Sequence, residues 1–224
     1  MAKLNSTAMR LYVGGFDPSL STTSLRVKLE AEGLDPTSFP DPAERVQNGV
    51  RMDSIEWAGW FDDASQAIDS LIGTLIGTVG DVVSVFVGTG TGARAFSGTA
   101  MTLSAKPAGN VKELVRVEAE WKPDQAWDAC KHFGPKRASS LPNDGSGGVS
   151  GTIDDTTGTS GTSFSYYHAF AFSPSASASY RFALQHSADG TTWVSHTTST
   201  LYTSTLVSTA ISTTGSLDRY VRVV

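Results

Sequence analysis

The chain has little of several features that would restrict its function. It has one cysteine, Cys130, in 224 residues, so no disulfide can form within it, which suits synthesis in a reducing cytosol. No apolar run approaches the roughly 20 residues that a membrane-spanning helix needs. Residues 1–5 carry a charge with no apolar stretch behind it. We therefore expect neither a membrane segment nor a secretory signal.

Positive charge is also scarce. The formal net charge is −5, from 17 basic and 22 acidic residues, which argues against a protein that coats nucleic acid. Beyond residue 138 there are three basic and five acidic residues, so the two parts carry 14 − 17 = −3 and 3 − 5 = −2. Neither part is basic, and the second contains no Lys and no Glu.

The composition changes near residue 139, where a run of small and polar residues begins. Such a run is typical of a linker or a loop. We predict a first β domain over residues 1–138, a linker over residues 139–161 and a small β domain over residues 162–224. Limited proteolysis of the free protein is expected to cut first within the linker.

Strands are predicted throughout the first domain, and at residues 25–30 and 111–121 the prediction rests on alternation of apolar and charged side chains. These strands cover residues 9–13, 25–30, 50–57, 81–88, 93–105 and 111–121. The last of them alternates apolar side chains with charges of both signs, which indicates one buried face and one that is solvated or meets another subunit. Residues 33–48 contain Pro36, Pro40 and Pro42 and little periodicity, so we expect a long loop, often a functional feature.

A single helix is predicted over about residues 62–77, after a short turn at residues 59–61. Its apolar residues recur at spacings of three and four and share one stripe: Ala64, Ala67, Ile68, Leu71, Ile72, Leu75 and Ile76. Asp62 or Asp63 can cap its first turn, and Gly77 is a typical stop. Because so short a helix is marginal alone, the stripe is expected to cover a neighbouring sheet.

The second domain is predicted to be an antiparallel sandwich. Its strands cover residues 164–172, 180–186, 191–196 and 219–224, with one or two more in residues 197–214. Asp189-Gly190 is a strong hairpin signal, within a segment that resembles a shortened Asp-box turn. The expected fold class is mainly β: an N-terminal β-sandwich or half-barrel with one flanking α-helix, plus a C-terminal antiparallel β-sandwich.

No motif identifies an active site. Gly88, Gly90 and Gly92 precede a strand rather than the helix that a phosphate loop needs, so they predict a hairpin turn. Cys130 and His132 supply two possible ligands, where a zinc site needs three or four. We expect no catalytic residue, no metal and no cofactor, and a protein that is not an enzyme.

The order of elements resembles that of the major tail (tail tube) proteins of long-tailed bacteriophages. The resemblance is carried by Arg-Met-Asp-Ser-Ile-Glu-Trp-Ala-Gly-Trp-Phe-Asp-Asp at residues 51–63 and by Gly-Ala-Arg-Ala-Phe-Ser-Gly-Thr-Ala at residues 92–100. Residues 185–193 and 219–223 are similar to the add-on β-sandwich of some such proteins.

The resemblance implies a structural virion protein that assembles with copies of itself. Six copies would form a ring, and rings would stack into a tail tube through which double-stranded DNA passes without specific binding. Other phage tail proteins would be partners, and the tail would be assembled in the host bacterial cytoplasm. The loop at residues 33–48 would reach the next ring. Its candidate contact residues are Asp35, Phe39, Asp41, Glu44 and Arg45.

Two other functions remain open. The first is a capsid decoration protein or adhesin whose C-terminal sandwich binds host glycans. Its candidate contact residues are Tyr166, Tyr167 and Trp193. The second is a hydrolase whose site carries no recognisable motif.

Overall fold

The computed structural model is mainly β. It describes residues 9–14, 16–35, 47–61, 76–88, 90–109, 114–124, 127–131, 153–154, 159–169, 181–200, 202 and 207–223. The helical structure in these ranges is one 3-10 turn, η2 (Pro18–Leu20). None of their helices is long and apolar enough to cross a membrane.

The predicted helix at residues 62–77 lies almost wholly outside the described residues. Only its end is described: Ile76 forms a parallel bridge with Thr102, and Gly77 has a φ of 79°. That conformation suits a glycine. The bridge at Ile76 shows that the predicted helix does not extend to residues 76–77.

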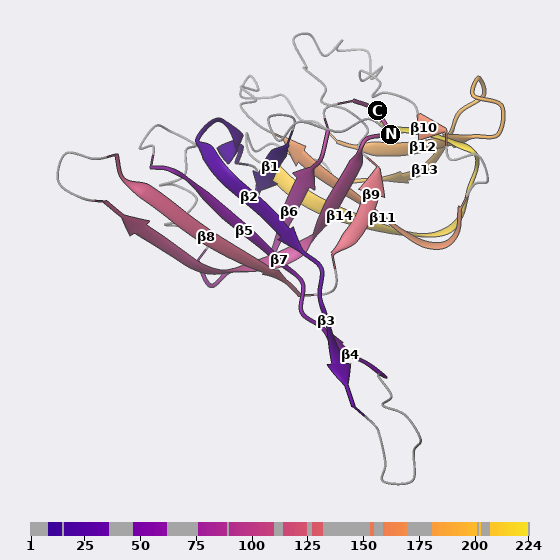
Figure 1. The fold of residues 1–224 in the computed structure, drawn as a ribbon. Helices are drawn as coiled ribbons and strands as arrows, with labels where there is room; N and C mark the ends of the chain where they lie inside the picture. The colour runs from indigo at the N-terminus through magenta and orange to yellow at the C-terminus, as the bar shows by residue number, and fades with distance from the viewer. Residues whose placement is uncertain are drawn as a thin grey trace, which may run out of the picture. The chain divides into compact units, whose positions relative to one another are not determined.

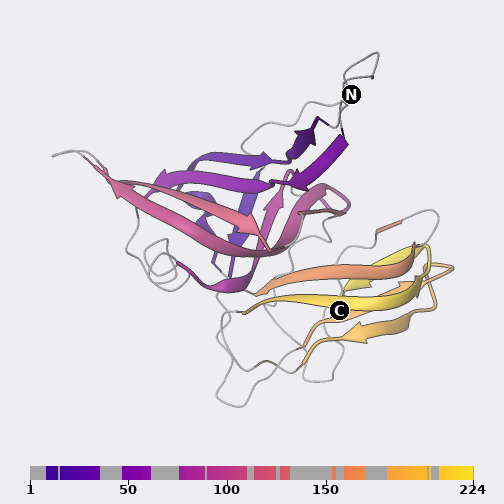
Figure 2. The same ribbon diagram turned by 90° about the horizontal axis from the view of Figure 1, so that it is seen from below.

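Seven strands hydrogen-bond in the order β1-β6-β7-β8-β5-β2, with β9 paired to β7. Figures 1 and 2 show this sheet curling into a half-barrel. Its strands are β1 (Arg10–Val13), β2 (Thr22–Lys28), β5 (Ser54–Trp60), β6 (Val79–Phe86), β7 (Arg94–Ala108), β8 (Arg116–Pro123) and β9 (Asp128–Lys131). The mainly β fold with a half-barrel sheet is therefore confirmed.

Contacts divide the chain into two units. Residues 1–19, 82–97 and 129–224 form one unit, and residues 20–81 and 98–128 form the other. Most of the linker predicted at residues 139–161 lies outside the described residues. The division into domains at residues 1–138 and 162–224 stays a prediction.

In the second unit, β8 shows the alternation that its sequence predicts. Val117, Ala119 and Trp121 are buried, whereas Arg116 and Glu118 are exposed. On the buried face, Trp121 lies opposite Ile55 of β5, and both side chains are fully buried. Cross-strand apolar pairs of this kind are the main stabilising contacts of a sheet, so the charged side chains are left on the opposite face.

The glycine-rich segment between β6 and β7 is a hairpin turn, as predicted. The amide of Ala93 donates a 3.0 Å hydrogen bond to the carbonyl of Gly90, and Val87 donates one of 2.9 Å to Arg94. A strand follows the turn, so the described residues contain no helix N-terminus there to receive a phosphate.

The C-terminal residues form two antiparallel sheets. One has the order β10-β15-β12-β13, and the other pairs β11 with β14. Their strands are β10 (Ile153–Asp154), β11 (Thr159–Ala169), β12 (Ala183–Ser187), β13 (Val194–Thr198), β14 (Val207–Leu217) and β15 (Tyr220–Val223). The Tyr167 ring of β11 stacks on Phe182, just before β12, with ring centroids 4.7 Å apart. The hairpin predicted at Asp189-Gly190 joins β12 to β13.

The turn predicted at residues 59–61 is wrong, because β5 continues through Trp60. Gly59 serves close packing instead. A Cβ there would lie 2.2 Å from Cζ2 of Trp57 and 2.6 Å from the Ser21 carbonyl oxygen. A glycine can therefore mark a crowded position within a strand as well as a turn.

Candidate assembly surfaces

Two strands extend the β2–β5 hairpin beyond the main sheet. β3 (Ala31–Leu34) continues β2, and β4 (Gln47–Arg51) leads into β5. They pair antiparallel, with Gly33 opposite Asn48, and among the described strands they pair only with each other. Figure 1 shows them projecting from the end of the hairpin. We name β3 and β4 the arm.

The arm corrects the expectation of a structureless loop over residues 33–48. Both ends of that segment are paired strand, and only residues 36–46 lie outside the described residues. Gly49 allows the two strands to approach, because a Cβ there would come 2.9 Å from the carbonyl oxygen of Glu32. The proline-rich segment therefore lies between two paired strands rather than in an isolated loop.

Apolar side chains on and beside the arm are exposed. They are Leu29, Leu34, Val50 and Met52, which we name the arm patch. Val50 is 71% exposed, and every residue of β3 is exposed. A two-stranded ribbon is marginally stable alone, and exposed strand edges are usually protected by charge or by a covering element. These side chains are what a neighbouring molecule would cover.

A buried carboxylate fixes the base of the arm. Asp53 lies between β4 and β5, and its side chain is 1% exposed. Its Oδ2 accepts hydrogen bonds from the Arg51 guanidinium of β4 and, at 3.2 Å, from the amide of Trp127. Arg51 lies opposite Ala31 of β3. The carboxylate therefore links the first paired residues of the arm to the body of its own unit.

The predicted inter-ring contacts belong to the segment between β3 and β4, and only one of them is described. Asp35 is exposed and directly follows β3. Phe39, Asp41, Glu44 and Arg45 lie outside the described residues. Their contact with a next ring stays a prediction.

A second group of exposed apolar side chains lies at the opposite end of the β2–β5 hairpin. It consists of Leu20, Trp60, Phe61, Leu114 and Val115, which we name the distal patch. Hydrogen bonds hold its segments together: the Trp60 amide donates to the Ser21 carbonyl at 2.9 Å, and Phe61 donates to Val115 at 2.8 Å. Leu20 is 98% exposed and Leu114 is 71% exposed. Sequence reasoning missed this patch, because it combines three separate segments.

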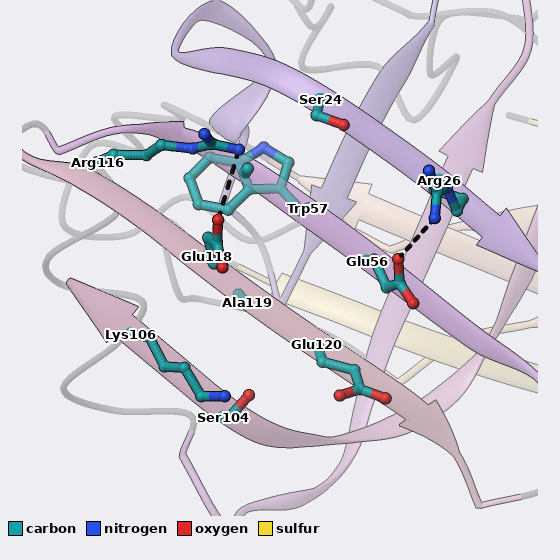
Figure 3. Close-up of a pocket in the computed structure, with 11 residues that line it drawn as sticks. Ser24, Arg26, Glu56, Trp57, Ser104, Lys106, Arg116, Glu118, Ala119 and Glu120 are labelled. Carbon is teal, nitrogen blue, oxygen red and sulfur yellow. Dashed lines mark ion pairs between the residues drawn. The ribbon is translucent and has the colours of Figure 1, made fainter. Parts of the chain in front are cut away.

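The solvent side of β2, β5, β8 and β7 is a polar face with a depression of about 290 Å³. Figure 3 shows the charged side chains around it. They are Arg26, Lys106 and Arg116 with Glu56, Glu118 and Glu120, so the charge is 3 − 3 = 0. The charged face that we predicted for β8 is therefore one part of a surface shared by four strands.

Ion pairs organise this polar face. Arg26 approaches Glu56 at 3.5 Å, Lys28 approaches it at 3.6 Å, and Arg116 approaches Glu118 at 3.4 Å. Glu56 lies directly opposite Glu120, and like charges in that position are unfavourable. The two cations beside Glu56 offset this repulsion. Each pair is partly exposed and contributes little stability, so its main effect is to place opposite charges beside each other on this face.

The three candidate glycan contacts lie on two different C-terminal sheets. Tyr166 and Tyr167 are on β11, whereas Trp193 directly precedes β13. Tyr167 is only 6% exposed, so it does not present its ring to a surface ligand. The guanidinium of Arg222 lies 4.0 Å from the centroid of the Trp193 ring. Glycan contact by Tyr166 and Trp193 stays a prediction.

Asp189 shapes the turn between β12 and β13. Its carboxylate accepts hydrogen bonds from the amides of Thr192 (2.7 Å) and Thr191 (2.8 Å) and from the hydroxyl of Ser187 (2.8 Å). These bonds, in that order, hold the pKa of Asp189 well below its ordinary value. Because these hydrogen bonds all come from residues of the same turn, the carboxylate has a structural role, as the sequence indicates.

Metal-binding geometry is absent from the part of the chain that the structure describes. No three of its His, Cys, Asp and Glu side chains are placed to hold an ion. Cys130 is half-buried on β9, and His132 lies outside the described residues.

No family model and no curated protein matches the sequence. Among solved structures, a chain of the native gene transfer agent virion has a TM-score of 0.49 and 21% identity, covering 58% of this chain and 99% of that chain. A chain of an extracellular contractile injection system sheath–tube complex has a TM-score of 0.44 and 11% identity, covering 57% of this chain and 93% of that chain. The SPP1 Dit protein has a TM-score of 0.40 and 12% identity, covering 96% of this chain and 98% of that chain. These similarities are weak, so function must be inferred from the residues of this chain.

Proposed function

We propose that this protein is a structural subunit of a bacteriophage-type tail tube. The observation that carries the proposal is the arm, a paired ribbon that extends the sheet and exposes the arm patch. Exposed apolar side chains on such a projection fit a subunit that is covered by its neighbours in an assembly. The sequences of residues 51–63 and 92–100 resemble those of tail tube proteins, which is why we propose a tail tube as the assembly.

In this proposal, six copies form a ring and rings stack into a tube. The ring of six is what the resemblance implies. The arm and the segment that joins its two strands contact the next ring, through the candidate residues Asp35, Phe39, Asp41, Glu44 and Arg45. Strand edges that would otherwise risk aggregation are covered by neighbouring subunits.

The polar face suits the wall of a channel for double-stranded DNA. A surface that binds phosphates firmly carries unbalanced Lys and Arg, because each neutralised phosphate adds affinity through released counterions. Here three cations are matched by three acids around the depression, and ion pairs occupy Arg26 and Arg116. A polyanion beside this face would not be held by net charge, and the net charge of −5 for the whole chain agrees with that.

The proposed protein is not an enzyme and needs no metal or cofactor. Its location is the virion tail, its partners are its own copies and other tail proteins, and its assembly takes place in the host cytoplasm. The C-terminal sheets would decorate the outside of the tube. The rival function, a decoration protein or adhesin, requires a glycan-binding surface on those sheets.

Electron microscopy of the concentrated, purified protein tests the proposal. We expect stacked hollow rings, and discrete monomers or trimers with glycan affinity would support the rival instead. Deletion of residues 35–45 should leave a folded protein, by circular dichroism, that no longer forms tubes. Val194→Ser is the matched control, because it changes an exposed valine of β13 outside the arm and should assemble normally. Unchanged tubes from the deletion variant would refute the role of the arm.

A further inference from the structure

The two exposed apolar patches lie at opposite ends of one continuous hairpin. The arm patch lies on and beside β3 and β4, and the distal patch surrounds the far end of β5. Val50 of the arm patch lies 10 residues before Trp60 of the distal patch. Gln47, which pairs with Leu34 at the outer end of the arm, lies 13 residues before Trp60. At a rise of about 3.3 Å per residue, these spans are about 33 Å and about 43 Å. A single copy therefore cannot bring its own patches together.

We propose that the distal patch is the site that receives the arm patch of a second copy of this chain. This inference rests on the proposed function and adds the receiving surface to it. Both patches are apolar and exposed. Contact between two different surfaces is head-to-tail, and a head-to-tail contact repeats from copy to copy, either closing into a ring or continuing as an open filament.

The occupant is a second copy because the geometry favours a repeating contact. A symmetric arm-to-arm contact would cover one patch and leave Leu20, Trp60 and Leu114 in water. A head-to-tail contact covers both patches on every subunit except the two at the ends of the row, each of which leaves one patch uncovered. The spacing of successive subunits along the assembly then cannot exceed the length of the hairpin, about 43 Å.

Cysteine cross-linking tests this contact in the full-length chain. In a Cys130→Ser background, we expect the Val50→Cys/Leu114→Cys variant to give a ladder of covalent multimers under mild oxidation. Both side chains are 71% exposed, so these changes should not disturb folding, which circular dichroism will verify. Each single-cysteine variant should remain monomeric on a denaturing gel. The matched control is Val50→Cys/Val194→Cys, which places the second thiol on an exposed valine outside the distal patch and should give no ladder.

The possible outcomes separate this inference from the proposed function. Dimers from Val50→Cys alone would show an arm-to-arm contact and overturn the inference. Tubes that form without a ladder from the double variant would also overturn it, while the tail tube proposal would stand. A ladder without hollow rings would support the head-to-tail contact and refute the tube. A subunit spacing well above 43 Å along assembled tubes would contradict the inference independently.

Discussion

The buried carboxylate at the base of the arm allows a quantitative prediction. Removing the Arg51 side chain leaves the Asp53 carboxylate buried with one described hydrogen bond, from the Trp127 amide. Breaking a buried ion pair in this way costs about 3–5 kcal/mol. Because the Arg51 side chain is 49% exposed, we expect Arg51→Ala to lie near the lower end, at about 3 kcal/mol of unfolding free energy.

Removing the carboxylate should cost less. Asp53→Ala leaves the buried Trp127 amide without its described acceptor, at a cost of about 1–3 kcal/mol, while the half-exposed Arg51 is hydrated by water. Asp53→Asn keeps a carbonyl acceptor and should cost about 1 kcal/mol. The double variant should be close to Asp53→Ala, because no buried charge remains.

Urea unfolding of the unchanged protein, Arg51→Ala, Asp53→Ala and the double variant forms a double-mutant cycle that checks this reasoning. Because the double variant should be about as stable as Asp53→Ala, the coupling energy between residues 51 and 53 should equal the cost of Arg51→Ala, about 3 kcal/mol, at the upper end of the range for residues in one ion-pair network. The unfolding measurements need a dilute sample in which no tubes form, because assembly would add to the apparent stability. A near-neutral Arg51→Ala variant, or additive single changes, would show that the carboxylate does not depend on the arginine.

Two further predictions concern stability. Gly59→Ala should destabilise the protein by about 1–3 kcal/mol through overpacking against Trp57. In the control Gly90→Ala, the added Cβ would have no atom within 4 Å, so the stability should change by no more than about 0.5 kcal/mol. Equal urea midpoints for the two variants would contradict this. Asp189 has a lowered native pKa, so its contribution is present above the unfolded value of about 3.9 and is lost as the pH falls below it toward the native pKa. The stability difference between the protein and Asp189→Asn should therefore shrink below about pH 4, and a difference that grows with acid would refute the assignment.

The sequence predicts best where local pattern and tertiary structure agree. In β8, the side chains that alternate in hydrophobicity are also those that alternate in burial, because Val117 and Trp121 face the β5 core. The turns at residues 88–92 and 189–190 follow from glycine and aspartate chemistry that needs no distant partner.

Prediction fails where distant residues decide the structure. The three prolines in residues 33–48 suggest a loop, yet Gly33 and Leu34 form strand because the β2–β5 pairing brings Asn48 and Gln47 beside them. The sequence around Gly59 suggests a turn, whereas the role of this glycine is to make room for the Trp57 ring and the Ser21 carbonyl. The distal patch has no sequence signal, because residues 20, 60–61 and 114–115 meet only in the folded unit.

Strand pairing in the arm matters for assembly because it lowers the cost of ordering. A flexible loop that binds a neighbour loses conformational entropy at each residue that becomes fixed, about 1–2 kcal/mol per residue for the backbone. In this protein the strands that carry Leu34 and Val50 already pair with each other, and Asp53 connects the base of the arm to Trp127. In the proposed contact between subunits, more of the apolar contact energy would then be retained as affinity.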